Sequence, residues 1–131
     1  AWLSNSWRGA LGIPLAFGLA WLSDKALRAM IFAPRPSSDW IAVAGPSSAS
    51  GLPSTFGLVY GSVFGALFIS AARGGFSLVA RSFALLLILV GTMARVVLGG
   101  HWASQMLASV LLGLLAASIA CNISNRLLPR E

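Results

Sequence analysis

The sequence predicts an all-α integral membrane protein whose core is a bundle of four apolar helices. Its residues are 57% hydrophobic and only 9% charged, with a mean hydropathy of +0.85, whereas soluble domains carry about 25% charged residues. Turn-forming segments divide the chain into four apolar runs, each near the ~20 residues that a helix needs to cross a bilayer. The runs belong to one transmembrane domain, residues 1–131, and cover residues 9–32, 52–72, 76–98 and 101–120.

The first apolar run, residues 9–32, carries charged side chains near its far end. Asp24, Lys25 and Arg28 follow Trp21 there, and tryptophan is enriched at the membrane–water interface. The uncharged centre of the run is short for a spanning helix. We therefore expect this helix to leave the membrane at its far end, where Asp24 and Lys25 are predicted to be interfacial rather than catalytic.

The second run, residues 52–72, is predicted to begin as a helix near Pro53, because the missing N–H of proline costs nothing in a first turn. Three glycines recur along it at every fourth residue, namely Gly57, Gly61 and Gly65. Such GxxxG steps let another helix backbone approach closely. Two uses remain open for this face: close packing within the chain, which we favour, and association with other membrane subunits.

A segment rich in Pro, Ser and Gly, residues 33–51, is predicted to be a loop, and loops of this length are usually functional.

Four spanning helices would place one group of basic residues at the end that holds the termini: Arg8, Arg73, Arg81, Arg126 and Arg130. The other end carries Lys25 and three arginines that we expect to bind a ligand. The positive-inside rule then predicts cytoplasmic termini in a bacterial inner membrane, with the loop on the periplasmic or outer face.

The composition excludes several classes of protein. The formal net charge is +6, but the nine basic residues are scattered singly and form none of the basic stripes that bind nucleic acid. A single cysteine, Cys121, excludes an intrachain disulfide and a cysteine-based metal site, and we expect no metal or other cofactor. The chain begins with alanine rather than methionine, which favours processing or additional upstream helices.

One short stretch, ARVVLGGHWASQ from Ala94 to Gln105, holds the only histidine of the chain, His101. The predicted topology brings three arginines to the same end of the bundle: Arg28, Arg35 and Arg95. Arginine is costly at membrane depth and binds phosphate oxygens through paired hydrogen bonds. A helix start near Ser54 and Thr55 would add backbone N–H groups, which also favour an anion. The sequence therefore predicts an anion site, with phosphate as the natural ligand.

Three short motifs follow one another along the chain. They are Arg28, six residues and Arg35-Pro36; then Pro53-Ser54-Thr55-Phe56; then Ala94-Arg95, five residues, His101, three residues and Gln105. In order and spacing they resemble the signatures of the type 2 phosphatidic acid phosphatases (PAP2), a family that shares its core with the vanadium haloperoxidases. Those signatures are a basic residue, six residues and Arg-Pro; Pro-Ser-Gly-His; and Ser-Arg, five residues, His, three residues and Asp. The resemblance covers the four helices and leaves the one or two additional N-terminal helices of the family unmatched.

The resemblance implies a membrane-embedded phosphatase that acts on a lipid phosphate or prenyl diphosphate through a phosphohistidine. By position, His101 would be the nucleophile and Gln105 would orient its ring. Arg95 would contribute both to catalysis and to phosphate binding. The complete set of implied phosphate ligands is Arg28, Arg35, Arg95, Ser54 and Thr55.

Three positions depart from the family pattern. Phe56 stands where the family has the histidine that protonates the leaving group, a contribution worth roughly 100- to 10,000-fold in rate. Gln105 replaces the orienting aspartate, and Ala94 replaces a serine. A diphosphate substrate would suffer least from these changes, because its leaving group is already a stable anion.

Three interpretations stay open from the sequence alone. The first is an active phosphatase with a reduced site. The second is a catalytically degenerate PAP2-like subunit that binds an anionic headgroup or is a structural component of a larger membrane complex. In the third, Arg95 and His101 are ordinary interfacial residues whose long side chains reach the lipid headgroups. A haloperoxidase is not expected, because those relatives are soluble and need the missing second histidine.

Overall fold

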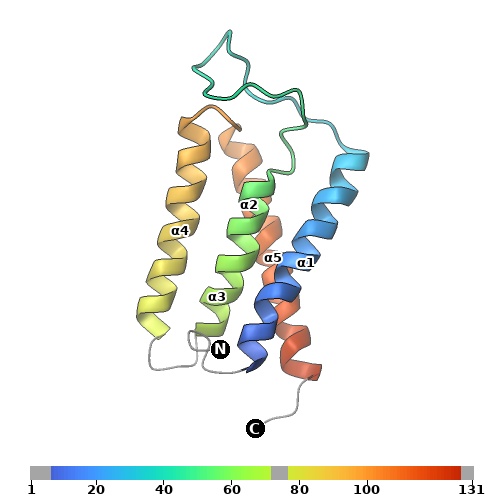
Figure 1. Ribbon diagram of the computed structural model, residues 1–131, viewed down its shortest axis with the longest axis vertical. Coiled ribbons are helices and arrows are strands. Elements are labelled where there is room, and N and C mark those ends of the chain that lie inside the picture. The colour runs from blue at the N-terminus through green and yellow to red at the C-terminus, as the bar shows by residue number, and fades with distance from the viewer. Residues whose placement is uncertain (1–6, 72–76, 128–131) are drawn as a thin grey trace.

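The computed structural model describes residues 7–71 and 77–127, and four helical segments lie side by side in it (Figure 1). Three are long: α1 (Trp7–Met30), α4 (Ser77–Val97) and α5 (Ala103–Leu127). The fourth is a continuous helical run made of α2 (Thr55–Val59), the π-helical turn η1 (Tyr60–Phe64) and α3 (Gly65–Ser70). No strand occurs within these two ranges. The predicted all-α fold class is therefore confirmed.

Three of the helical segments are long and apolar enough to cross a membrane, namely Ala10–Met30, α4 and α5. The run Thr55–Ser70 is also apolar but shorter. Large apolar side chains face outward along the bundle, where water would disfavour them; on α4 they include Leu78, Phe83, Leu86, Leu89 and Met93. The bundle thus has the outer surface of a membrane protein. The second helix is shorter than the predicted range 52–72 because it begins at Thr55.

The second helix begins at Thr55 rather than near Leu52. Ser54 is its N-cap: the backbone of Ser54 is extended, and its side-chain oxygen accepts a hydrogen bond from the Gly57 N–H at 3.3 Å. A capping serine satisfies a backbone donor that has no partner inside the helix. Pro53 therefore lies before the helix, in the segment that runs down to it from the loop, and not in the first turn.

The glycine face of this second helix packs against α5 of the same chain. A Cβ atom on Gly61 would overlap the Val110 carbonyl oxygen, and one on Gly57 would stand 2.7 Å from Ser109 Cβ. A Cβ atom on Gly113 of α5 would in turn stand 2.6 Å from the Leu58 carbonyl oxygen. The two backbones therefore meet where neither side carries a Cβ atom. Because α5 covers this face, another subunit would reach it only by displacing α5.

The turn between α4 and α5 supports the long loop. Gly99 has φ +67°, a left-handed conformation that glycine adopts without cost, and it ends α4. The backbone N–H of Ala44 donates to the Leu98 carbonyl oxygen at 3.1 Å, so the loop lies against this turn. His101 belongs to the same turn and precedes α5, which continues to Leu127. The predicted helix from His101 to Ala120 is displaced at both ends.

The start of α1 and the end of α5 lie at one end of the bundle, and the loop and the α4–α5 turn lie at the other (Figure 1). Single cysteines introduced at Ser48 in the loop and at Arg126 in α5, in a Cys121→Ala background, are therefore expected to react with an impermeant maleimide from opposite sides of the membrane. Labelling of whole cells and of inverted vesicles checks this. Reaction of both positions from the same side would contradict the topology.

Candidate functional site

The last two turns of α1 carry a partly buried ion pair. Arg28 Nε donates to Asp24 Oδ1 at 3.0 Å, and the Thr55 hydroxyl donates to the same oxygen at 3.2 Å. Asp24 is only 5% exposed, whereas Lys25 is exposed with its ammonium 5.7 Å from the Trp21 ring centroid. Asp24 therefore lies inside the end of the bundle, where Arg28 and Thr55 hold its carboxylate. The four-residue spacing of Asp24 and Arg28, which places both on one helical face, is the signal that could have revealed the pair.

Arg28 and Arg35 converge on the backbone of the long loop. Arg28 donates to the Ser50 carbonyl oxygen at 3.0 Å and to the Pro53 carbonyl oxygen at 2.6 Å. Arg35 donates to the same Ser50 oxygen at 3.4 Å and to the Gly100 carbonyl oxygen at 3.2 Å. Two guanidiniums thus meet at one carbonyl group. Arg35 thereby fixes the loop against the α4–α5 turn, and Arg28 fixes it to the end of α1.

Arg95, in the last turn of α4, joins this group from the other side. Its guanidinium carbon lies 4.2 Å from the Phe56 ring centroid, which is a cation–π contact. A Cβ atom on Gly100 would stand 3.3 Å from Arg95 Nη2, so Gly100 lies between Arg95 and Arg35. Within the described ranges, the buried Arg95 Nε has no hydrogen-bond partner. Arg95 is therefore held against the Phe56 ring rather than by loop carbonyl groups.

The three guanidiniums make the end of the bundle positive. Burial lowers the pKa of Arg35, and the charges of Arg28 and Arg95 lower it further. Asp24 is the only buried carboxylate in the part of the chain that the structure describes, and it is already paired with Arg28. An anion bound among the arginines would relieve their mutual repulsion.

His101 lies inside this cluster and is 2% exposed. Its Nδ1 is 2.9 Å from the Gly51 carbonyl oxygen, and its Nε2 is 3.2 Å from Ser54 Oγ. A carbonyl oxygen only accepts hydrogen bonds, so in the neutral ring the proton is on Nδ1. Nε2 then carries the free electron pair and accepts from the Ser54 hydroxyl. A backbone carbonyl therefore selects the tautomer and fixes the ring, as a carboxylate does in other histidine sites.

Burial lowers the pKa of His101 below its usual 6.5, and the positive charges of Arg35 and Arg95 lower it further. The hydrogen bond to Gly51, and a weaker contribution from Gln105, act in the opposite direction. The imidazole is therefore neutral at pH 7, which is the form that carries a nucleophilic electron pair. Because the unfolded chain binds more protons between pH 6.5 and the lower folded pKa, stability is expected to fall as the pH drops through that window.

This pKa can be measured directly, since His101 is the only histidine of the chain. With imidazole-labelled protein in detergent micelles, an NMR titration is expected to give a midpoint below 6.5. Arg35→Gln, which removes the largest neighbouring charge effect, is expected to raise the midpoint toward 6.5. A midpoint at or above 6.5 in the wild-type protein would contradict the burial and charge environment described above.

Gln105 lies in the first turn of α5, and its side chain acts on His101 by raising the pKa of the imidazole. His101 precedes α5, so the two residues do not share a helical face. The side-chain oxygen of Gln105 accepts from the Trp102 N–H at 3.2 Å, and its nitrogen donates to the Pro34 carbonyl oxygen at 2.8 Å. Gln105 therefore connects the start of α5 to the loop beside Arg35. The backbone carbonyl oxygen of Gln105 also accepts a hydrogen bond from the hydroxyl of a buried serine.

That serine, Ser109, was not singled out from the sequence. Its hydroxyl donates to the Gln105 carbonyl oxygen at 2.7 Å and accepts from the Ser54 N–H at 2.7 Å. Ser109 thereby holds Ser54 beside His101. Thr55, one residue later, lies on the other side of the helix start, where it contacts Arg28 and Asp24. The structure thus places Ser54 at the histidine and Thr55 at the ion pair, rather than both in one cradle.

The predicted site residues thus gather at the loop end of the bundle, with Arg28, Arg35, Arg95 and Ser54 around His101. Sequence comparison identifies the same architecture, because a family model for the PAP2 superfamily matches residues 9–128. No curated protein and no solved structure matches the chain. The match spans nearly the whole chain, and residues 28–105, which contain the three motifs, lie within it. This helical membrane protein belongs to the PAP2 superfamily.

Proposed function

We propose that the protein is a membrane phosphatase that transfers the terminal phosphoryl group of a lipid diphosphate to His101 and then to water. One observation carries this proposal: a buried imidazole with Nδ1 on the Gly51 carbonyl oxygen and Nε2 on Ser54, surrounded by arginines. That arrangement supplies a neutral, oriented nucleophile beside a positive field. Both are needed to attack a phosphorus atom that carries negative oxygens.

The reaction has two steps. In the first, the Nε2 electron pair of His101 forms a bond to the terminal phosphorus, the bridging P–O bond breaks, and the lipid monophosphate leaves with the electron pair. In the second, water attacks the phosphohistidine and releases inorganic phosphate and the neutral imidazole. Ser54 Oγ must first turn away from Nε2, and its hydroxyl is then free to donate to a phosphate oxygen.

The arginines have different tasks in this scheme. Arg28 and Arg35 already donate to backbone carbonyl groups, so their main contribution is charge and a fixed loop. Arg95 has a buried Nε with no hydrogen-bond partner among the described residues, and its guanidinium lies over the Phe56 ring. We assign Arg95 the direct contact with the transferring phosphoryl group, where charge develops and preorganised donors lower the barrier.

The leaving group decides the substrate class. Phe56 cannot donate a proton, and the sequence contains no second histidine. A phosphate monoester would have to expel an alkoxide, which needs a proton in the transition state. A diphosphate expels a phosphate monoester anion, which is a stable leaving group without added protonation. The reduced site is therefore suited to diphosphates.

A second function is supported by the same contacts. Most hydrogen bonds of Arg28 and Arg35 go to the protein's own backbone, which is the pattern of a structural clamp. With Phe56 in the acid position, the chain would then be a catalytically degenerate PAP2-like subunit that binds an anionic headgroup. Such a subunit would bind phosphate without turning it over.

Phosphate release by purified protein in detergent distinguishes the two functions. The enzyme is expected to hydrolyse farnesyl diphosphate at least about 100-fold faster than farnesyl monophosphate, because only the second reaction needs the missing acid. Phosphate binding without turnover of either compound would favour the degenerate subunit. Equal rates with both compounds would contradict the assignment of Phe56 as the lost acid position.

A further inference from the structure

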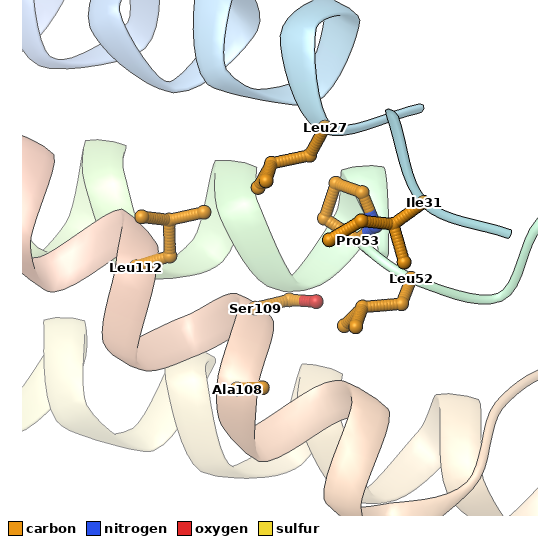
Figure 2. Close-up of a pocket in the computed structure, with 7 residues that line it drawn as sticks. All are labelled: Leu27, Ile31, Leu52, Pro53, Ala108, Ser109 and Leu112. Atoms are coloured by element: carbon orange, nitrogen blue, oxygen red, sulfur yellow. The ribbon is translucent and has the colours of Figure 1, made fainter. Parts of the chain in front are cut away.

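Phe56 is a large apolar residue that is not buried in the bundle: it is 49% exposed, although it lies in the first turn of α2. Two apolar grooves lie beside the start of this helix. The lining of one includes Pro53 and Ser109 (Figure 2), and the lining of the other includes Thr55 and Leu58. Among the described residues that line the two grooves, Phe56 belongs to neither set. Packing of the apolar bundle therefore does not account for this ring.

The ring of Phe56 faces the Arg95 guanidinium instead. The guanidinium carbon lies 4.2 Å from the ring centroid, which is closer than the 5.4 Å between Arg81 and the Phe68 ring. A cation and an aromatic face attract each other electrostatically within about 6 Å. The start of the second helix thereby gives the last turn of α4 a partner for its arginine.

The backbone that carries the ring is fixed on both sides of Phe56. The Gly57 N–H donates to Ser54 Oγ at 3.3 Å, and the Ser54 N–H donates to Ser109 Oγ at 2.7 Å. Figure 2 shows the Ser109 side chain projecting from α5 toward the segment that leads into this helix. A Cβ atom on Gly57 would stand 2.7 Å from Ser109 Cβ, so the first turn also packs closely against α5. The ring therefore projects from a firmly held base.

An aromatic ring differs in kind from the partners of the other two arginines. Arg28 and Arg35 donate to backbone carbonyl oxygens, and each such bond occupies an N–H group. A π face attracts the charge of a guanidinium without accepting the N–H groups that lie in its plane. A carboxylate in the same place would neutralise the arginine and repel a phosphate. The ring fixes Arg95 and leaves its positive charge available to an anion.

Arg95 needs this support because the cluster around it is positive. Burial, and then the charges of Arg28 and Arg95, lower the pKa of Arg35, so the three guanidiniums act on one another. Without an anion, their repulsion favours conformations in which Arg95 turns away. The ring offsets this repulsion. Gly100 leaves room for the guanidinium, since a Cβ atom there would stand 3.3 Å from Arg95 Nη2.

We infer that Phe56 is a positioning residue: its ring holds the Arg95 guanidinium at the anion site before an anion arrives, and so raises the affinity of the site for a diphosphate group. Preorganisation of this kind lowers the cost of binding. The position that carries the proton donor in the family pattern thus serves anion binding in this chain. The inference rests on the proposed phosphate site but requires no turnover, so it applies equally to a phosphatase and to a subunit that only binds a headgroup.

Binding of methylenediphosphonate, a diphosphate whose bridge cannot be hydrolysed, tests the inference by calorimetry on the full chain in detergent. Phenylalanine analogues with one, two and three ring fluorines at position 56 keep the shape of the ring and weaken its π face stepwise. We expect the dissociation constant to rise with each fluorine. Phe56→Leu is expected to raise it about two- to fivefold, the value of one exposed cation–π contact. Phe56→Trp, which offers the strongest π face, is expected to bind at least as tightly as the wild type.

Two controls establish whether the ring acts through Arg95. In an Arg95→Gln background, Phe56→Leu is expected to cause no further change in the dissociation constant, because a double-mutant cycle isolates the coupling between the two side chains. Phe68→Leu removes a ring that contacts Arg81 in the same way, at the opposite end of the bundle (Figure 1). It is expected to leave methylenediphosphonate binding unchanged.

Four results would overturn the positioning role: no binding to the wild type, no response to fluorination, an undiminished effect of Phe56→Leu in the Arg95→Gln background, or an equal effect of Phe68→Leu. The phosphatase proposal fails on a different result, the absence of phosphate release from farnesyl diphosphate. Affinity that follows the fluorine series in a protein without phosphate release would support the positioning role and refute the phosphatase. Phosphate release with an affinity indifferent to fluorine would do the reverse.

Discussion

Replacing His101 by alanine is expected to lower phosphate release from farnesyl diphosphate by a factor on the order of 10³ or more, because loss of a nucleophile removes the covalent route itself. His101 is buried, and its Nδ1 donates a hydrogen bond to the Gly51 carbonyl oxygen. The alanine variant therefore also loses a hydrogen bond that supports the loop. The measurement is phosphate release, with the unfolding temperature of the variant recorded alongside.

His101→Asn separates these two effects. The asparagine amide nitrogen can still donate to the Gly51 carbonyl oxygen, but nothing replaces Nε2. This variant is expected to be nearly as stable as the wild type and as inactive as His101→Ala. Added imidazole is expected to restore part of the activity of His101→Ala. Turnover in His101→Asn close to the wild-type rate would refute the nucleophile assignment.

Phe56→His is expected to raise the hydrolysis of farnesyl monophosphate by a factor on the order of 10² to 10³, because it restores a proton donor at the leaving-group position. The change should be tolerated, since Phe56 is 49% exposed and its main contact is the Arg95 guanidinium. Loss of the cation–π contact costs about 0.5–1 kcal/mol at such a site. Phosphate release from both farnesyl compounds measures the effect.

Phe56→Leu is the matched control, because it removes the same ring and supplies no acid. It should not raise monophosphate hydrolysis, and an increase equal to that of Phe56→His would show that relief of the Arg95 contact, not proton donation, is responsible. Gln105→Asp is not expected to add to the effect. The shorter carboxylate cannot donate to the Pro34 carbonyl oxygen, so the start of α5 would lose its connection to the loop.

Helix number and order were predictable from the sequence, because each apolar run has a length that the bilayer dictates. The helix ends were not predictable, because they depend on individual hydrogen bonds. Ser54 caps the second helix and shortens it, and His101 remains in the turn that Gly99 opens. Hydropathy carries no signal for the π-helical turn at Tyr60–Phe64 either.

The three arginines and the histidine were predictable because their motifs lie at the ends of successive helices. Their partners were harder to predict. Gly51 contributes only a carbonyl oxygen, which every residue possesses, and Ser109 resembles other small residues on an apolar helix. Asp24 could have been found from its spacing to Arg28. The orienting role given to Gln105 assumed a helix that includes His101, whereas α5 begins at Ala103.

The most direct measurement is rapid-quench labelling with farnesyl diphosphate that carries ³²P in its terminal phosphate. The account predicts a labelled intermediate that is stable in base and labile in acid, as a phosphohistidine is, and a single labelled peptide that contains His101. His101→Asn should show no label. Steady hydrolysis without a labelled protein, or an acid-stable label on the peptide that contains Ser54, would contradict the central claim that His101 accepts the phosphoryl group.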